Sequence, residues 1–211
     1  AGIQTGGIPP FLFNLAGITT WNYFKECLTA TADTFKKNEA IFGKVYFPRI
    51  IMPMSIVVSN LLKFGIQILI LGLFYIYYVA TGTQVKPSIY LLLFPFLVLL
   101  MGMLGLGLGM IISSMVTKYR DLTFLVSFGI QLLMYISLVV IPLSLFQEKG
   151  FEWAVKYNPM AYIIEAARFM LLNEGNVSQF GIIYTVSFSI IVLLLGIVIF
   201  NKTEKSFIDT I

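Results

Sequence analysis

The sequence contains no histidine and one cysteine among its 211 residues. Without imidazole groups, histidine acid–base catalysis and histidine-rich metal sites are excluded for this chain. The single Cys27 excludes an intrachain disulfide. Charged residues make up only 11% of the chain, whereas an average soluble domain has about 25%. These shortages leave few of the side chains that soluble enzymes use.

Apolar residues are abundant instead. They make up 58% of the chain, and the mean hydropathy is +0.90. This composition is typical of an all-α polytopic membrane protein, because helices satisfy their own backbone groups in lipid. The formal net charge is +4. The basic residues lie between apolar runs, which indicates membrane topology and argues against a nucleic-acid partner.

The apolar runs predict five membrane spans, because a helix crosses a bilayer with about 20 apolar residues. The expected spans are Ile8–Leu28, Ile50–Ala80, Ile89–Met115, Leu122–Phe146 and Phe180–Phe200. The first is the weakest, since two asparagines, a lysine and a glutamate interrupt it.

Lysine and arginine predict the orientation of these spans. Thr29–Arg49, Val116–Asp121 and the tail after Phe200 together carry eight of these cations, and the connections on the other side carry four. The more basic side is expected to be cytoplasmic, which places the C-terminus in the cytoplasm. Five spans then place Ala1 outside, although no signal-peptide pattern precedes Ile8. We therefore expect an earlier span and a cytoplasmic N-terminus to precede this sequence.

The outer connection, residues 147–179, is predicted to contain helices of its own. Asn158 is a suitable N-cap, Pro159 suits the first helical position, and the apolar residues that follow lie on one helix face. The segment Met160–Leu172 is too short to cross a bilayer. It is either a re-entrant helix or a cap on the lipid headgroups, and the sequence leaves both open. A short amphipathic piece, "EKGFEWAVKY", precedes it.

Three motifs carry a family resemblance. They are "KVYFPR" (Lys44–Arg49) after a "W-x-x-F" span, "YRDL" (Tyr119–Leu122), and "NPM" followed by an "E-x-x-R" helix (Asn158–Arg168). In this order and spacing, the chain resembles the permease subunit of polysaccharide-exporting ABC transporters, a family that includes O-antigen, teichoic-acid and capsule exporters. The resemblance covers essentially the whole chain, apart from that family's N-terminal cytoplasmic helix and first span.

The resemblance implies the architecture and the partners. It implies six spans in the full subunit, a homodimer with a central channel, and two copies of a separate ATPase subunit. The cargo would be a lipid-linked polysaccharide, and the location would be the cytoplasmic (inner) membrane of a bacterium, in contact with membrane lipids. Residues 1–211 would form a single permease domain, with no nucleic-acid partner.

The resemblance also implies that residues 34–49 form a cytoplasmic coupling segment on the ATPase. Pro48 cannot continue a preceding helix but suits the first turn of the next one, and Arg49 would lie at the headgroups. The alternative is a plain basic loop. In the next basic segment, Asp121 is expected to cap a helix with its carboxylate. The residues assigned to ATPase coupling are Phe35, Lys37, Asn38, Ile41, Phe42, Lys44, Tyr46, Pro48, Arg49, Tyr119, Arg120 and Asp121.

The sequence has no G-x-x-x-x-G-K-[ST] phosphate loop. The glycine-rich "GMLGLGLGM" (Gly102–Met110) lacks the lysine and is expected to let helices pack closely in lipid. The chain is therefore predicted to be a transport subunit without catalytic residues, metal or cofactor, whose ATPase partner binds Mg-ATP.

A sugar channel needs polar and aromatic side chains along its wall. The fourth predicted span places such residues about one helical turn apart. The second predicted span carries a second polar row, made of Ser55, Ser59, Lys63 and Gln67. The Lys63 ammonium would need a partner inside a membrane. Either row could instead bond neighbouring helices. The predicted channel-lining residues are Thr123, Phe124, Ser127, Phe128, Gln131 and Tyr135, and the predicted gate residues are Asn158, Pro159, Glu165 and Arg168.

Two other classes of protein remain as alternatives. A stand-alone secondary transporter or lipid flippase would use inverted repeats and acidic residues inside the membrane. No repeat is visible, and the acids are expected at span ends or in loops. A membrane enzyme such as a glycosyltransferase would use clustered carboxylates. Those of the outer connection are dispersed.

Overall fold

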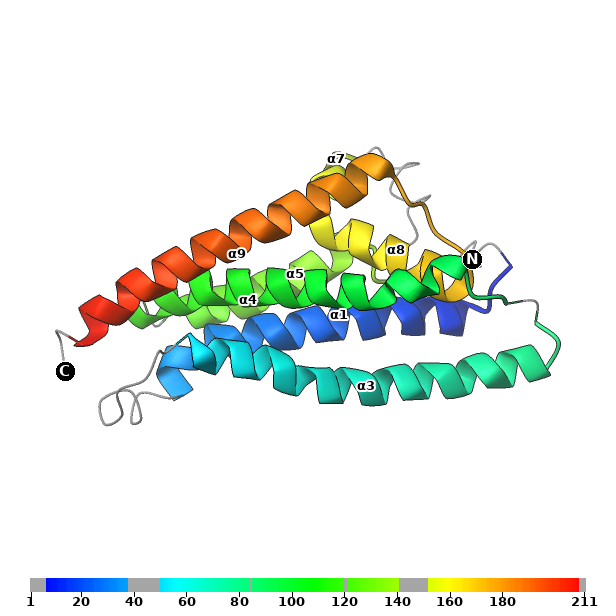
Figure 1. The fold of residues 1–211 in the computed structure, drawn as a ribbon, viewed down its shortest axis with the longest axis horizontal. Coiled ribbons are helices and arrows are strands. Elements are labelled where there is room, and N and C mark those ends of the chain that lie inside the picture. Colours follow the sequence, from blue (N-terminus) through cyan, green and yellow to red (C-terminus); the bar gives the residue numbers. More distant parts are fainter. Residues whose placement is uncertain (1–6, 38–49, 84, 120, 141–151, 209–211) are drawn as a thin grey trace.

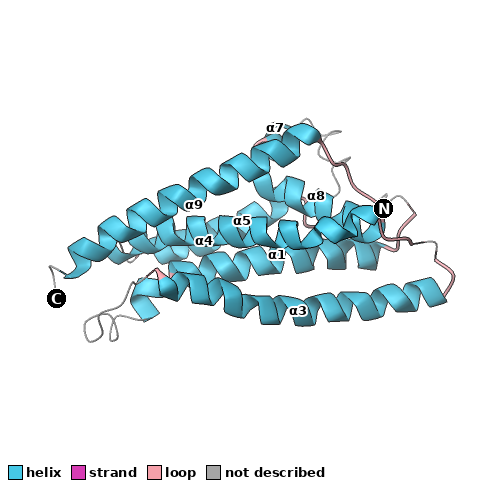
Figure 2. Ribbon diagram, viewed as in Figure 1, coloured by secondary structure: helices cyan, strands magenta, loops and turns pink. Residues whose placement is uncertain are grey.

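The structure is a computed structural model that describes residues 7–37, 50–83, 85–119, 121–140 and 152–208. Helices account for the regular structure of these residues (Figure 2). Their bounds are α1 (Pro10–Ala32), α3 (Ile51–Ala80), the 3-10 helix η1 (Ile89–Leu93), α4 (Phe94–Lys118), α5 (Leu122–Ile136), α7 (Glu152–Lys156), α8 (Pro159–Leu172) and α9 (Gln179–Ile208).

The helices form an elongated bundle around α1 and α4 (Figure 1). Helix α3 packs along α1, and α9 packs along α4. The glycines of α4 allow these contacts: a Cβ atom on Gly105 would lie 2.7 Å from the Cβ of Cys27 in α1. A Cβ atom on Gly107 would lie 2.8 Å from the backbone nitrogen of Leu193 in α9. The structure thus confirms that the glycine run serves close helix packing.

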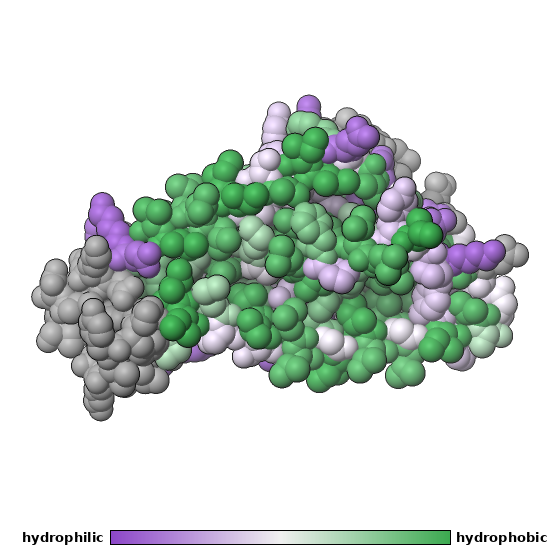
Figure 3. Space-filling model, in the orientation of Figure 1, coloured by the Kyte–Doolittle hydropathy of each residue, from purple (hydrophilic) through white to green (hydrophobic). Residues whose placement is uncertain are grey.

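The surface of the bundle is largely apolar, as Figure 3 shows. Among the residues that the structure describes, three helical stretches are long and apolar enough to cross a membrane, namely α3, the continuous Ile89–Lys118, and residues Gln179–Thr203 of α9. These features define a multi-pass membrane protein.

Helix α1 is long enough to cross a bilayer, because its 23 residues extend about 34 Å. Several of its polar residues are buried, and Glu26 forms a partly exposed ion pair. Thr19 and Thr20 are buried, and the Glu26 carboxylate lies 3.3 Å from the Lys63 ammonium of α3. Lys63 therefore has the partner that its position in a span predicted.

Helix α5 is shorter than predicted. It ends at Ile136 after 15 residues, about 22 Å, whereas the hydrocarbon core is about 30 Å thick. The chain turns beyond it, and Leu138 adopts a φ of 60°. Contacts with α8 hold this turn: Asn158 Nδ2 donates to Ser137 Oγ, and Arg168 Nη2 donates to the Val139 carbonyl. The prediction of one helix from Leu122 to Phe146 is therefore wrong, and residues 141–146 lie outside the described residues.

One end of the bundle collects the basic residues. Helices α1, α4 and α9 finish there, and α3 and α5 begin there (Figure 1). We call it the basic end, and its exposed lysines are Lys36, Lys37, Lys118 and Lys202. The described parts of the three cation-rich segments therefore all lie at the basic end. Arg168, which the charge count placed in an outer loop, is fully buried instead, so its charge carries no information on topology.

Candidate functional site: a half-length helix pair and its cavities

Helix α8 begins where α5 ends, near the middle of the bundle (Figure 1). Asn158 joins the two helices: its Nδ2 donates to Ser137 Oγ at 2.9 Å, and its Oδ1 accepts from the Met160 amide at 3.0 Å. Pro159 occupies the first helical position. The predicted N-cap and helix start are confirmed, and α5 and α8 form a pair of half-length helices.

Helix α8 lies within the bundle rather than on its surface. Ten of its 14 residues are buried, and it packs against α1, α4 and α9. This packing favours the re-entrant interpretation over a cap on the headgroups. Asn173 ends the helix in the left-handed conformation, with a φ of 57°.

The predicted gate residues Glu165 and Arg168 form a buried ion pair. Arg168 is 0% exposed, and its Nη1 lies 3.1 Å from Glu165 Oε1. Its Nη2 donates to the Val139 carbonyl at 2.8 Å, and its guanidinium lies 3.7 Å from the ring centre of Phe13 in α1. We call the Glu165–Arg168 pair, with its contacts to Val139 and Phe13, the α8 anchor. It ties α8 to α1 and to the turn after α5.

Two further contacts surround the α8 anchor. Glu165 Oε2 accepts from the Asn176 amide at 3.1 Å. A Cβ atom on Gly17 would lie 2.6 Å from Arg168 Nη2, so the absence of a side chain in α1 makes room for the guanidinium. The ion pair therefore holds α8 in place.

The predicted channel residues lie together on α5. Phe124, Ser127, Phe128, Gln131 and Tyr135 are exposed, and Thr123 is half-buried. The opposite side of α5 supplies Ile130 to the main core, with Leu133 packed against it. The polar and aromatic stripe therefore faces away from the rest of the chain. In the second row, Lys63 bonds across to α1, whereas the Ser55 hydroxyl donates to the Met52 carbonyl of its own helix.

Eight of the predicted coupling residues lie outside the described residues, namely Asn38, Ile41, Phe42, Lys44, Tyr46, Pro48, Arg49 and Arg120. Lys37 is exposed and lies 3.0 Å from the Asp33 carboxylate, and Tyr119 is also exposed.

Of the other two, Phe35 is buried and Asp121 does not make the predicted cap. Phe35 is only 3% exposed, and its ring stacks on Phe200 of α9 with the centres 4.6 Å apart. Its side chain is therefore part of the core and offers no surface to a partner. Asp121 is the N-cap residue of α5, but its side chain makes no capping hydrogen bond because its own backbone is helical.

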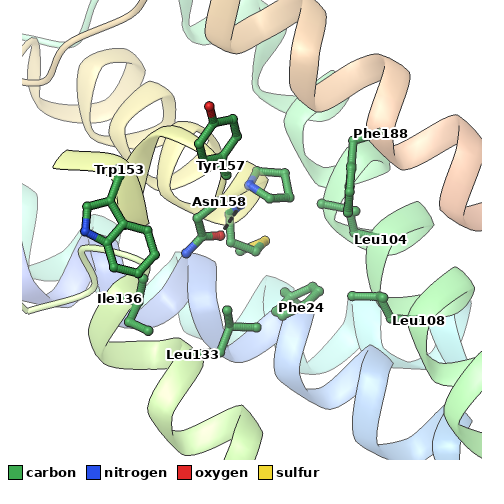
Figure 4. A pocket seen from close by; sticks show the side chains of 11 residues that line it. Phe24, Leu104, Leu108, Leu133, Ile136, Trp153, Tyr157, Asn158 and Phe188 are labelled. Atoms are coloured by element: carbon green, nitrogen blue, oxygen red, sulfur yellow. Dashed lines mark hydrogen bonds between the residues drawn. The ribbon is translucent and has the colours of Figure 1, made fainter. Parts of the chain in front are cut away.

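Two cavities adjoin the α5–α8 junction, and sequence reasoning did not find them. The first has a volume of about 350 Å³. Figure 4 shows Leu133 and Ile136 of α5 facing Leu104, Leu108 and Phe188 across it. The second has a volume of about 550 Å³ and lies along α7 and α8. Trp153 and Tyr157 line both, and their spacing of four residues in "EKGFEWAVKY" was the available signal.

Half-length helices that are enclosed by protein occur in membrane transport proteins. The chain matches the family described as ABC-2 type transporter over residues 4–172. It belongs to that family.

Curated relatives are similar to nearly the whole chain. An "O-antigen export system permease protein RfbA" of Klebsiella pneumoniae is 30% identical over 200 residues, which are 94% of this chain and 74% of the relative. A protein of the same name from Myxococcus xanthus is 25% identical over 214 residues, 99% of this chain and 79% of the relative.

Proposed function

We propose that this chain is the channel-forming subunit of an ABC transporter that exports a lipid-linked polysaccharide across a bacterial cytoplasmic membrane. The observation that carries the proposal is the similarity to O-antigen export permeases, at 30% identity over 94% of the chain. The sequence contains no phosphate loop, so two copies of a separate ATPase subunit would bind Mg-ATP.

The stripe on α5 supports a channel between two copies of the chain. A face that carries Ser127, Gln131 and Tyr135 is unfavourable against lipid tails, but it suits hydrated sugars. A second copy facing the first would enclose this surface and keep it wet. Exposed Phe124 and Phe128 would add rings on which the C–H faces of sugars can stack.

The coupling role of residues 34–49 has a route into the bundle. The Phe35–Phe200 stack connects the helical start of this segment to α9. Displacement of the segment by the ATPase would therefore reach α9, since packed aromatic rings move together.

Reconstitution tests the proposed function. Vesicles containing the full-length chain and its ATPase partner should transfer the glycolipid only with ATP, and Gln131→Leu or Tyr135→Leu should reduce transfer about tenfold or more by removing polar contacts in the path. The glycan that reaches the far side is measured by an impermeant lectin. Val126→Leu, on the half-buried side of α5, is the control. Transfer without the ATPase would support a secondary transporter, and full transfer by both stripe variants would remove α5 from the path.

Cysteine labelling tests the orientation. In a Cys27→Ser background, single cysteines at Lys37, Lys118 and Lys202 at the basic end should be shielded from an impermeant thiol reagent added to intact cells. Cysteine at Lys86, in the exposed connection after α3, should react. The labelled fraction is read by mass spectrometry. External labelling at Lys37 with protection at Lys86 would reverse the proposed orientation.

A further inference from the structure

The two cavities at the α5–α8 junction differ in chemistry. The inner one is lined by α1, α4, α5, α7, α8 and α9 with side chains that are mostly apolar, among them Phe24, Leu104, Leu133 and Phe188. This cavity is partly open beside the exposed rings of Trp153 and Tyr157, and its apolar lining favours apolar molecules over water. Its volume of about 350 Å³ is within the usual range of ligand pockets. A hydrocarbon chain is the ligand that suits this lining.

The outer cavity offers polar groups. Its described lining includes the Lys156 ammonium, the Ser178 hydroxyl and the Tyr162 ring. Ser178 Oγ accepts from the Gly181 amide at 3.0 Å, so its own proton can be donated to a ligand. Glu165 forms part of the wall, but its carboxylate is held by Arg168 and by the Asn176 amide. Hydrogen-bonding groups beside exposed aromatic rings suit a sugar.

The two cavities meet at Trp153 and Tyr157. These side chains line both cavities, and they are 65% and 64% exposed. Trp153 lies in α7, and Tyr157 directly follows that helix. Trp and Tyr are the residues that occupy boundaries between apolar and wet surroundings. One molecule with an apolar chain and a polar head can therefore occupy both cavities, with its junction at these two rings.

We propose that the joined cavities form a binding site for a glycolipid, with its hydrocarbon chain between α5 and α4 and its first sugars along α7 and α8. The site is separate from the α5 stripe, because Leu133 and Ile136 face the cavity from the other side of that helix. The choice of a glycolipid as the ligand rests on the proposed function. The division of the site into an apolar and a polar half follows from the lining residues. Asn158, which joins α5 to α8, is also part of the inner wall, so an occupied site would touch the joint of the half-length helix pair.

Photo-crosslinking tests the site in the full-length chain, extracted into native nanodiscs without detergent. The probe is dodecyl maltoside with a photoreactive diazirine in its chain. Cross-links should map to peptides that contain Leu133 or Phe188. Leu133→Trp, which fills the inner cavity, should lower the yield about fivefold or more. Leu132→Trp, the neighbouring substitution at an exposed position on α5, should leave the yield unchanged.

Competition distinguishes a glycolipid from its parts. Unlabelled dodecyl maltoside should compete at least about tenfold better than maltose or dodecylphosphocholine, because only the glycolipid fills both cavities. Lys156→Ala should weaken that competition, and Lys86→Ala should not. Equal competition by dodecylphosphocholine would reduce the site to a lipid-chain pocket, and equal competition by maltose would reduce it to a sugar site; either result overturns the proposal. Binding is measured without transport, so a chain that binds the probe but exports no glycan would refute the proposed function alone.

Discussion

Replacing Arg168 by leucine is expected to destabilise the protein by about 3–5 kcal/mol, because it leaves the buried Glu165 carboxylate without its cation. The substitution also removes the donor to the Val139 carbonyl and the contact with Phe13, so α8 loses its ties to α1 and to the turn after α5. The free energy of unfolding of the full-length chain, measured by denaturant titration in micelles, gives the effect.

A double variant separates the charge from the packing. Glu165→Gln combined with Arg168→Leu should recover part of the lost stability, since a neutral amide is less costly to bury than an unpaired carboxylate. Lys86→Leu, at an exposed position in a connection, should change the free energy of unfolding by no more than about 0.5 kcal/mol. Wild-type stability in Arg168→Leu would show that the α8 anchor does not hold the bundle together.

Gly107→Leu is expected to force α4 and α9 apart, with a loss of about 2 kcal/mol or more. The Cβ atom that leucine adds would lie 2.8 Å from both the Leu193 nitrogen and the Val192 oxygen. Both are backbone atoms, so a change of rotamer cannot relieve the clash. The free energy of unfolding and the elution volume of the full-length chain report the change.

Gly129→Leu is the matched control for that substitution. Gly129 is also inside a helix, but a Cβ atom there would meet nothing within 4 Å. The stability of Gly129→Leu should therefore be no lower than that of the wild type, because leucine is also the better helix former. If Gly107→Leu and Gly129→Leu unfold at the same denaturant concentration, the glycine run is not needed for the contact between α4 and α9.

The sequence predicted features that depend on neighbours along the chain. Asn158 and Pro159 marked the start of α8 because capping and a fixed φ act within one turn. The glycine run predicted close packing because it removes side chains from a helix face. The ion pair of Lys63 was expected because an ammonium in lipid needs a partner, although its identity, Glu26, depends on how α1 and α3 pack.

Other features were missed because they depend on contacts across the fold. Hydropathy predicted one helix through Phe146, whereas donors from α8 bond the chain just after Ile136. The burial of Phe35 was missed, because its stacking partner Phe200 lies at the other end of the sequence. The inner cavity is lined by six helices and the outer one by α7, α8 and connecting segments, so no local pattern contains them.

The α8 anchor also constrains the order in which the chain is built during biosynthesis. An arginine near the centre of a helix costs about 2.5–3.5 kcal/mol when the translocation machinery releases that helix into lipid. Helix α8, with 14 residues, is too short to make up this cost by spanning the bilayer. Helix α8 therefore needs a binding surface on a helix that is already inserted, and the Phe13–Gly17 face of α1 provides this surface. Because α1 leaves the ribosome long before α8, this surface is synthesised first and the charged helix afterwards.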